Sequence, residues 1–206
     1  MSSIIRGSIS SRQRPLLGAD SSRFDVWGLL LDNRGNSAEQ LLFLSSMITV
    51  SNIIRRAIPD DAVLLSELAL RSKGHWGYSQ EFLESCRSEL TVDARRIGSD
   101  DYHCFVAVQD DRVIGFYTAA NVSKNTYELD ALFVEPEHIG TGVGRSLLQH
   151  AIQSLSELGA EHLIIQGDPH AGDFYAAAGA RQTGSRESES IPGRFLPVFK
   201  IDIASC

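Results

Sequence analysis

Residues 127–146 read YELDALFVEPEHIGTGVGRS and contain three patterns in succession. The first part alternates, which predicts a strand with one face formed by Tyr127, Leu129, Ala131 and Phe133 and the other by Glu128, Asp130, Leu132 and Val134. Pro136 has no N–H to give to a neighbouring strand, so the strand should end before it. Glycines then occupy the alternate positions 140, 142 and 144, and apolar residues follow at helical spacing. We therefore expect a strand, a glycine-rich turn and an amphipathic helix.

The turn and the start of this helix have the properties of an anion site. The apolar stripe of the helix consists of Val143, Leu147, Ala151, Ile152, Leu155 and Leu158, and Gly159 is suited to the position just past the helix end. The first amides of a helix lack intrahelical acceptors, and the helix dipole adds positive charge there. Glycines also let a bulky anion approach the backbone. The pattern favours phosphate binding over a turn whose glycines only satisfy geometry.

Two common phosphate loops do not fit these residues. The nucleoside-triphosphate loop requires Lys before Ser or Thr, whereas the chain has Arg145 before Ser146, and Ile139 stands where the first Gly of that loop belongs. The dinucleotide loop requires a Gly three residues after its second one, where the chain has Arg145. Both classes of nucleotide-binding protein are therefore excluded.

The stretch VEPEHIGTGVGRSLL resembles the acetyl-coenzyme A loop of the GNAT N-acetyltransferase superfamily, which has Val-x-Pro, then Gln/Arg-x-x-Gly-x-Gly/Ala, then paired leucines. Ile139 departs from the usual Gln or Arg, although its backbone amide is the same. The resemblance extends over about residues 52–203 and implies acetyl-coenzyme A as cosubstrate, with no metal. It assigns the pantetheine to the backbone of Leu132, Phe133 and Val134, and the pyrophosphate to the amides of Ile139, Gly140, Thr141, Gly142, Val143 and Gly144, with a charged contact from Arg145.

The resemblance also suggests two catalytic residues. Glu128 matches the position of the glutamate base in histone-acetylating members, and a neighbouring acid at Asp130 can raise a pKa by like-charge repulsion. The alternative is that both acids sit at a solvated strand end. Residues 173–180, DFYAAAGA, resemble the family's Phe-Tyr-x-x-x-Gly-Phe segment with Ala180 in place of Phe. That segment implies that Tyr175 protonates the leaving thiolate, and Asp173 at its start is assigned to the coenzyme. From the residues alone, Tyr175 could equally be a core residue.

Composition excludes several classes of function. The chain has 206 residues, 43% hydrophobic content and a formal net charge of −7, with no basic run, which argues against nucleic acid. No apolar run approaches the roughly 20 residues of a membrane helix. The three cysteines, Cys86, Cys104 and Cys206, lack paired spacing, which favours free thiols in a cytoplasmic protein over disulfides or a zinc site.

Residues 1–51 differ in composition from the rest, with many serines and scattered arginines. We expect them to be a dispensable or disordered extension, with Met47 as an alternative start. An organelle transit peptide is the other interpretation, which Asp20, Asp25, Asp32 and Glu39 weaken.

The remaining elements follow from periodicity and capping residues. Strands are expected at 53–58, 103–108, 112–119, 161–166, 181–185 and 196–203, and helices from 59 to about 72, from a Ser79 cap to about 90, and over 171–178. This order is that of the GNAT fold, an α+β fold with a mixed sheet of about six to seven strands flanked by helices on both faces. The domain should occupy residues 52–206.

The acceptor is not identified by any residue. His75, Trp76 and Tyr78 lie in a loop that borders the acceptor pocket in this superfamily, where they would either wrap a substrate or plug the core. Asp168 should cap the following turn, and His170 should be structural. We expect acetyl transfer to a primary amine, of a small molecule or a peptide, through a direct ternary complex, and a homodimer is left open. The alternatives are a coenzyme-binding module without catalysis and a transferase for longer acyl groups.

Overall fold

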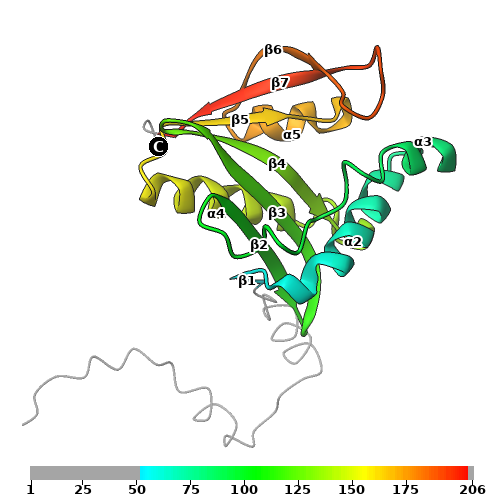
Figure 1. Ribbon diagram of the computed structural model, residues 1–206, viewed down its shortest axis with the longest axis horizontal. Helices are drawn as coiled ribbons and strands as arrows, with labels where there is room; N and C mark the ends of the chain where they lie inside the picture. The colour runs from blue at the N-terminus through cyan, green and yellow to red at the C-terminus, as the bar shows by residue number, and fades with distance from the viewer. Residues whose placement is uncertain (1–51, 204–206) are drawn as a thin grey trace, which may run out of the picture. The chain divides into compact units, whose positions relative to one another are not determined.

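The computed structural model describes residues 52–203, and the predictions made for residues 1–51, including Met47, fall outside this range. The chain divides into two units, residues 1–49 and 50–206, and the fold is that of the second. Its centre is a seven-stranded mixed sheet with the strand order β1-β2-β3-β4-β5-β7-β6 (Figure 1). The predicted fold class, α+β with helices on both faces, is confirmed.

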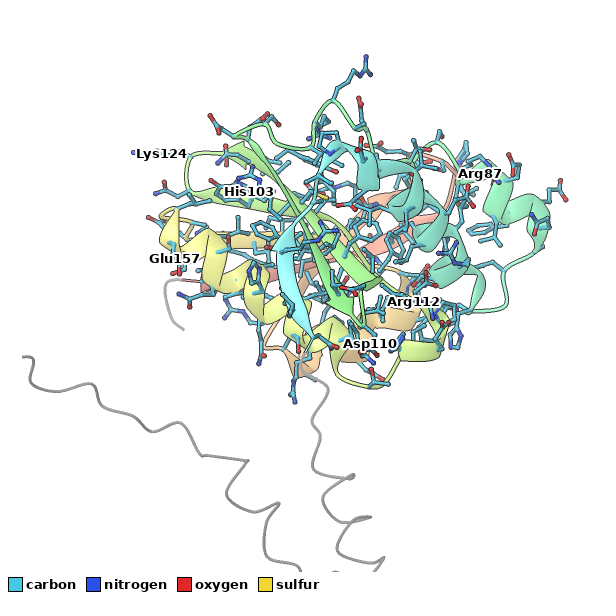
Figure 2. The ribbon with its side chains drawn as sticks, turned by 90° about the horizontal axis from the view of Figure 1, so that it is seen from below. Arg87, His103, Asp110, Arg112, Lys124 and Glu157 are labelled. Carbon is cyan, nitrogen blue, oxygen red and sulfur yellow. The ribbon has the colours of Figure 1, made fainter. Side chains whose placement is uncertain are left out.

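All seven strands overlap the predicted positions, although β1 ends two residues earlier than expected and β3 and β6 extend beyond their predicted ends. They are β1 Ile53–Arg56, β2 Tyr102–Gln109, β3 Arg112–Ser123, β4 Thr126–Val134, β5 His162–Gln166, β6 Arg181–Glu187 and β7 Phe195–Asp202. The β2–β3 turn places Asp110 and Asp111 at positive φ, which suits a tight hairpin (Figure 2 labels Asp110). Among the strand pairs of residues 52–203, only β4–β5 is parallel.

Two helices cover each face of the sheet. The helices α2 Ala62–Gly74 and α3 Gln80–Ser85 pack on one face, and α4 Val143–Glu157 and α5 Gly172–Ala177 pack on the other. Single 3₁₀ turns, Pro59–Asp61, Pro136–His138 and Pro169–Ala171, precede α2, α4 and α5. Among the described residues, no helix combines the length and the apolar character needed to cross a membrane.

Local sequence signals account for the helix ends. The hydroxyl of Ser79 accepts the Phe82 amide and starts α3, as predicted. The second helix is nevertheless shorter than expected: it ends at Ser85, and residues 86–90 form turns. Gly159 and Gly179 follow α4 and α5 with positive φ, which removes the steric cost of ending a helix there. Leu158, which was assigned to the apolar stripe of α4, lies past the helix end and is exposed.

The predicted alternation along β4 is wrong beyond Leu129, because a β-bulge interrupts it. Leu129 pairs with Ala119 of β3 and Ala131 pairs with the adjacent Thr118, so Asp130 is an extra residue in the ladder. The extra residue moves each later side chain of the strand to the opposite face of the sheet. Leu129, Leu132 and Val134 therefore pack on the α4 side, while Ala131 and Phe133 pack on the α2 side. Periodicity gave the strand correctly but could not reveal a one-residue insertion.

Candidate functional site

The loop between β4 and α4 brings glycines to conformations that other residues rarely adopt. Gly140 has φ +82° and Gly142, the N-cap of α4, has φ +96°. A Cβ atom added at either glycine would have no protein atom within 4 Å. The backbone is therefore open to a ligand on that side. Gly144 differs, because a Cβ there would touch Phe174 and Val134, so this glycine serves close packing of the helix.

Five amides of this loop and the first turn of α4 have no acceptor among residues 52–203. The amide of Ser146 donates to the Gly142 carbonyl, and those of Ile139 and Thr141 donate to Pro136 and His138 at 3.3 Å each. The amides without acceptors belong to Gly140, Gly142, Val143, Gly144 and Arg145. We call these five groups the amide socket. Arg145 itself is exposed and forms no ion pair with a described residue.

These five donors have the properties of an anion site. They lie at the positive end of a 15-residue helix, and no side chain of the loop covers the two glycines. The predicted amides of Ile139 and Thr141 have internal partners, which reduces the predicted backbone contacts to Gly140, Gly142, Val143 and Gly144, with Arg145 added. Ile139 packs against the core with its side chain.

The strand leading into the loop has one open edge. β4 pairs with β3 along most of its length, but it pairs with β5 only from Thr126 to Leu129. Beyond that point the two strands diverge, as Figure 1 shows toward the arrowhead of β4. The backbone groups of the second half of β4 that point away from β3 therefore have no neighbouring strand among residues 52–203 to pair with.

The backbone groups of the three residues predicted to bind pantetheine do not all point to the open edge. The amide of Glu135 donates to Ile114 of β3, so by antiparallel alternation Phe133 also points toward β3. Leu132 and Val134 then point to the open edge. The Val134 amide donates a long hydrogen bond of 3.4 Å to the hydroxyl of Ser72, a buried residue of α2. Leu132 and Val134 thus offer backbone contacts, and Phe133 does not.

An ion pair joins the end of α2 to the start of the loop. Arg71 binds Glu135 with both arms of its guanidinium, Nε at 3.1 Å from one carboxylate oxygen and a terminal nitrogen at 2.5 Å from the other. Glu135 lies between β4 and the 3₁₀ turn that leads to the glycines. This bidentate pair fixes the loop against α2. Neither residue was predicted to belong to the site, because Arg71 and Glu135 are 64 positions apart in the sequence.

Tyr175 lies in the hydrophobic core beneath the diverging strands. Only 6% of its surface is exposed, and its ring packs against Phe174 and Phe199. Gly167 makes room for it: a Cβ at that position would lie 2.9 Å from the tyrosine ring. Burial raises the pKa of the Tyr175 hydroxyl. The hydroxyl therefore carries a proton at neutral pH, but the raised pKa makes it a weaker acid than an ordinary tyrosine. Asp173, two residues earlier, is exposed.

The two acids of β4 have different surroundings. Glu128 forms an ion pair with Arg186 of β6 at 2.5 Å, and 19% of its side-chain surface is exposed. Asp130, the bulge residue, forms no ion pair with a described residue. It keeps contact with solvent, yet partial desolvation raises its pKa to about 6; the charges of Glu128 and Glu189 add to the rise, and that of Arg96 opposes it. The expected like-charge effect therefore falls on Asp130 and is smaller than desolvation.

A cluster of side chains connects the end of α2 with three loops near the open edge. We call it the Lys73 cluster; its members are Lys73, Tyr78, Asp168 and Arg194. The Tyr78 hydroxyl donates to Asp168 at 2.9 Å and accepts a hydrogen bond of 2.8 Å from Arg194. Lys73 and Arg194 both lie near the carboxylate of Asp168, at 3.7 Å and 3.4 Å. Asp168 also accepts the His170 amide, which confirms the predicted cap.

The aromatic residues of the α2–α3 loop extend this cluster. Trp76 stacks on His170 with ring centroids 5.2 Å apart, and Tyr78 stacks on Phe82 at 4.4 Å. Trp76 remains 42% exposed, so it is not a core plug. Its contact with His170 joins the α2–α3 loop to the turn before α5, which is a structural role for both rings.

The sequence is similar to that of known acetyltransferases. A protein-family model described as an acetyltransferase (GNAT) domain matches residues 66–192. Among curated proteins, the chain is 31% identical over 98 residues to the peptidyl-lysine N-acetyltransferase YjaB of Escherichia coli (strain K12). That alignment covers 47% of this chain and 61% of the relative, so it spans less than two thirds of that protein.

Solved structures show the same fold. The PaiA N-acetyltransferase of Thermoplasma acidophilum, in complex with coenzyme A, matches with a TM-score of 0.61 at 22% identity, over 74% of this chain and 99% of that one. The ribosomal-protein-S18-alanine N-acetyltransferase of Escherichia coli matches with a TM-score of 0.56 at 19% identity, over 74% and 94%. The acceptors named for the two Escherichia coli proteins, a peptidyl lysine and an alanine of ribosomal protein S18, differ. Since the family model covers more than half of the sequence, the chain belongs to the GNAT acetyltransferase family.

Proposed function

We propose that the protein transfers the acetyl group of acetyl-coenzyme A to a primary amine through a direct ternary complex. The observation that carries the proposal is the continuity of two binding surfaces: the open edge of β4 at Leu132 and Val134 leads into the amide socket without a break in the chain. An extended thioester with a diphosphate at its far end requires such a path. Membership of the family supports the same reaction.

Binding uses the backbone more than side chains. The amide socket holds the pyrophosphate, and Arg145 adds a charge-assisted contact from the first turn of α4. Leu132 and Val134 pair with the amides of the pantetheine arm, and Asp173 lies at the start of α5 for a polar contact. Arg71 and Glu135 keep the loop in place so that its amides need not reorganise on binding.

The chemistry needs a base and an acid. The ammonium group of the substrate amine must first lose a proton, and one of the two acids of β4 takes that proton. The amine nitrogen then forms a bond to the thioester carbon as the bond from that carbon to sulfur breaks, and the nitrogen gives its surplus proton to solvent to leave a neutral amide. The leaving thiolate takes the proton of the Tyr175 hydroxyl, which solvent later replaces. No other group or redox change is required, and no acetyl-enzyme forms, because Cys104 is buried in β2 and burial raises its thiol pKa to about 12.

Within the acid pair, we assign the base to Asp130 in the first place. Its pKa of about 6 places it in the ionised form at pH 7 while leaving it a stronger base than an ordinary carboxylate. Glu128, the residue suggested by the resemblance, remains the second candidate. Its carboxylate is held by Arg186, which would have to move before it could reach an acceptor.

The acceptor is an amine of a small molecule or a peptide, and the protein acts in the cytoplasm. Both described cysteines, Cys86 and Cys104, are buried free thiols, which is consistent with a reducing compartment. A homodimer remains a proposal; β6 is an edge strand with all seven residues exposed and is the natural place to look for a second copy. Light scattering of the purified protein measures its mass directly.

Thiol release from acetyl-coenzyme A, measured with a panel of amines, tests the function. We expect release that depends on both the thioester and an amine. Coenzyme binding without amine-dependent release for any member of the panel would favour a binding module that has lost catalysis. Faster release from propionyl or longer thioesters would instead identify a transferase for larger acyl groups.

A further inference from the structure

The Lys73 cluster holds more positive than negative charge. Two cations, Lys73 and Arg194, share the single carboxylate of Asp168. They flank the stacked rings of Tyr78 and Phe82: Arg194 lies 4.9 Å from the Phe82 ring centroid, and the Lys73 ammonium lies 5.7 Å from that of Tyr78. Asp168 also receives the hydroxyl of Tyr78 and the amide of His170, so its oxygens are already well occupied.

Lys73 is the member with the fewest contacts. Only 10% of its side-chain surface is exposed, and its ammonium makes no hydrogen bond to any residue of 52–203. Its one ion pair in that range is the 3.7 Å contact to Asp168, which is beyond hydrogen-bond distance. Covered ammonium groups normally have several acceptors, because desolvation without hydrogen bonds is costly. The ammonium of Lys73 therefore has hydrogen-bond donors without an acceptor among residues 52–203, which an anionic ligand would satisfy.

A second acid nearby, Glu89, forms no ion pair with Lys73 or Arg194. The charges of Glu89, Lys73 and Arg194 all influence the pKa of the Cys86 thiol, so these residues lie in one region. The carboxylate of Glu89 instead accepts the hydroxyl of Ser190.

The position of the cluster links it to the reaction. Lys73 follows Ser72, whose hydroxyl contacts Val134 at the open edge of β4. Asp168 lies two residues after the end of β5, where β4 and β5 have separated, and Arg194 immediately precedes β7. Three loops thus meet beside the path of the thioester. The pantetheine arm carries no negative charge, so the anion must come from the other substrate.

We propose that Lys73 and Arg194 bind a carboxylate of the acceptor, so that the preferred substrates are amines that also carry a carboxylate. This inference rests on the proposed function and names its substrate class. Amino acids, and peptides with a carboxylate close to the reacting amine, belong to the class. Polyamines and other purely cationic amines do not.

Matched acceptor pairs test the preference in the full-length protein. L-lysine and cadaverine differ by one carboxylate, as do L-phenylalanine and 2-phenylethylamine. Thiol release should give the carboxylate-bearing member of at least one pair a kcat/KM at least ~10-fold higher. The advantage should fall to about one in Lys73→Met and in Arg194→Gln, with the loss in KM and with an unchanged Kd for coenzyme A.

Control variants separate this role from general charge and stability. Lys124→Met removes a lysine at the β3–β4 turn, on the side of the molecule opposite Arg87 of the α3 region (Figure 2). Arg95→Gln removes an arginine whose side chain is 91% exposed. Both should keep the wild-type ratio within each pair. Arg194→Lys, which keeps the charge, should recover part of the preference.

The outcomes are distinct. Turnover of amines with no advantage for the carboxylate in either pair would overturn the inference and leave the proposed function intact. Absence of turnover with every amine would instead count against the proposed function. In that case, calorimetry with coenzyme A and the acetylated members of each pair still decides the inference, because equal affinities for N-acetyl-lysine and N-acetylcadaverine would contradict it.

Discussion

The two halves of the candidate site are built in opposite ways. The amide socket uses backbone groups of one short segment, and its glycines keep side chains away. The Lys73 cluster uses side chains from the end of α2 and from three loops, and its hydrogen bonds join residues up to 116 positions apart in the sequence. A socket made by local conformation suits a cosubstrate that does not vary within the family. A cluster made by tertiary contacts can change one residue at a time, which suits an acceptor that differs between relatives.

The largest expected effect breaks the backbone half. Gly142→Glu introduces a side chain and a negative charge where the amide socket opens, and we expect the Kd for coenzyme A to rise at least ~100-fold. Gly98→Glu is the matched control, since Gly98 also has positive φ, at +93°, and a Cβ there would meet nothing within 4 Å. It should lose stability to a similar extent and keep its affinity. Calorimetry gives both constants. Unchanged affinity of Gly142→Glu would remove the socket from the binding site.

The next effect concerns which acid of β4 takes the proton. Asp130→Asn should lower kcat/KM about 100-fold at pH 7, and Glu128→Gln should lower it less. In the wild type, the rate should rise with pH through about pH 6 as Asp130 ionises. Asp130→Asn should lose this limb, and Glu128→Gln should keep it. Pre-steady-state or steady-state rates over pH 5 to 9 decide between them, and the reverse pattern would make Glu128 the base.

A smaller effect is expected at the acid. Tyr175→Phe keeps the ring contacts with Phe199 and removes only the hydroxyl, so kcat should fall at least ~10-fold while the Kd for coenzyme A is unchanged. Tyr127→Phe, on β4 and facing His103, is a control that should keep its rate. Single-turnover rates measure the chemical step. Equal kcat values for Tyr175→Phe and the wild type would leave this tyrosine as a core residue only.

The smallest effect is on stability. The pKa of Asp130 is higher in the folded protein than the ordinary value of 3.8, so the folded state binds more protons and loses stability as pH rises from about 4 to about 6. Asp130→Asn removes this loss. Because the residue keeps solvent contact, we expect a gain of only about 1 kcal/mol, or about 2–4 °C in Tm, at pH 7.5 and less at pH 4.5. A constant difference between the two pH values would contradict the shifted pKa.

Much of the backbone half was predictable from the sequence. The alternating strand, the glycines and the helical stripe each have a local signature, and the structure places them where the sequence predicted. The bulge at Asp130 has no such signature, because an inserted residue leaves the composition of the strand unchanged and only alters its pairing with β3. That single residue decides which side chains of β4 face which layer.

The side-chain half could not be predicted in the same way. Arg71 with Glu135, and Lys73 with Asp168 and Arg194, meet only after the sheet has brought distant loops together. Sequence spacing carries no information about such pairs. The sequence did indicate Tyr78 and Asp168 as loop residues of interest, but their mutual hydrogen bond, which centres the cluster, depends on the packing of α2 against β4.

A crystal structure with coenzyme A tests the central claim most directly. We predict that the pyrophosphate oxygens lie within about 3.2 Å of at least three amides of the socket, Gly140, Gly142, Val143, Gly144 and Arg145, with the pantetheine along Leu132 and Val134. A coenzyme bound elsewhere on the domain, or a pyrophosphate held only by side chains while these amides face solvent, would contradict the account.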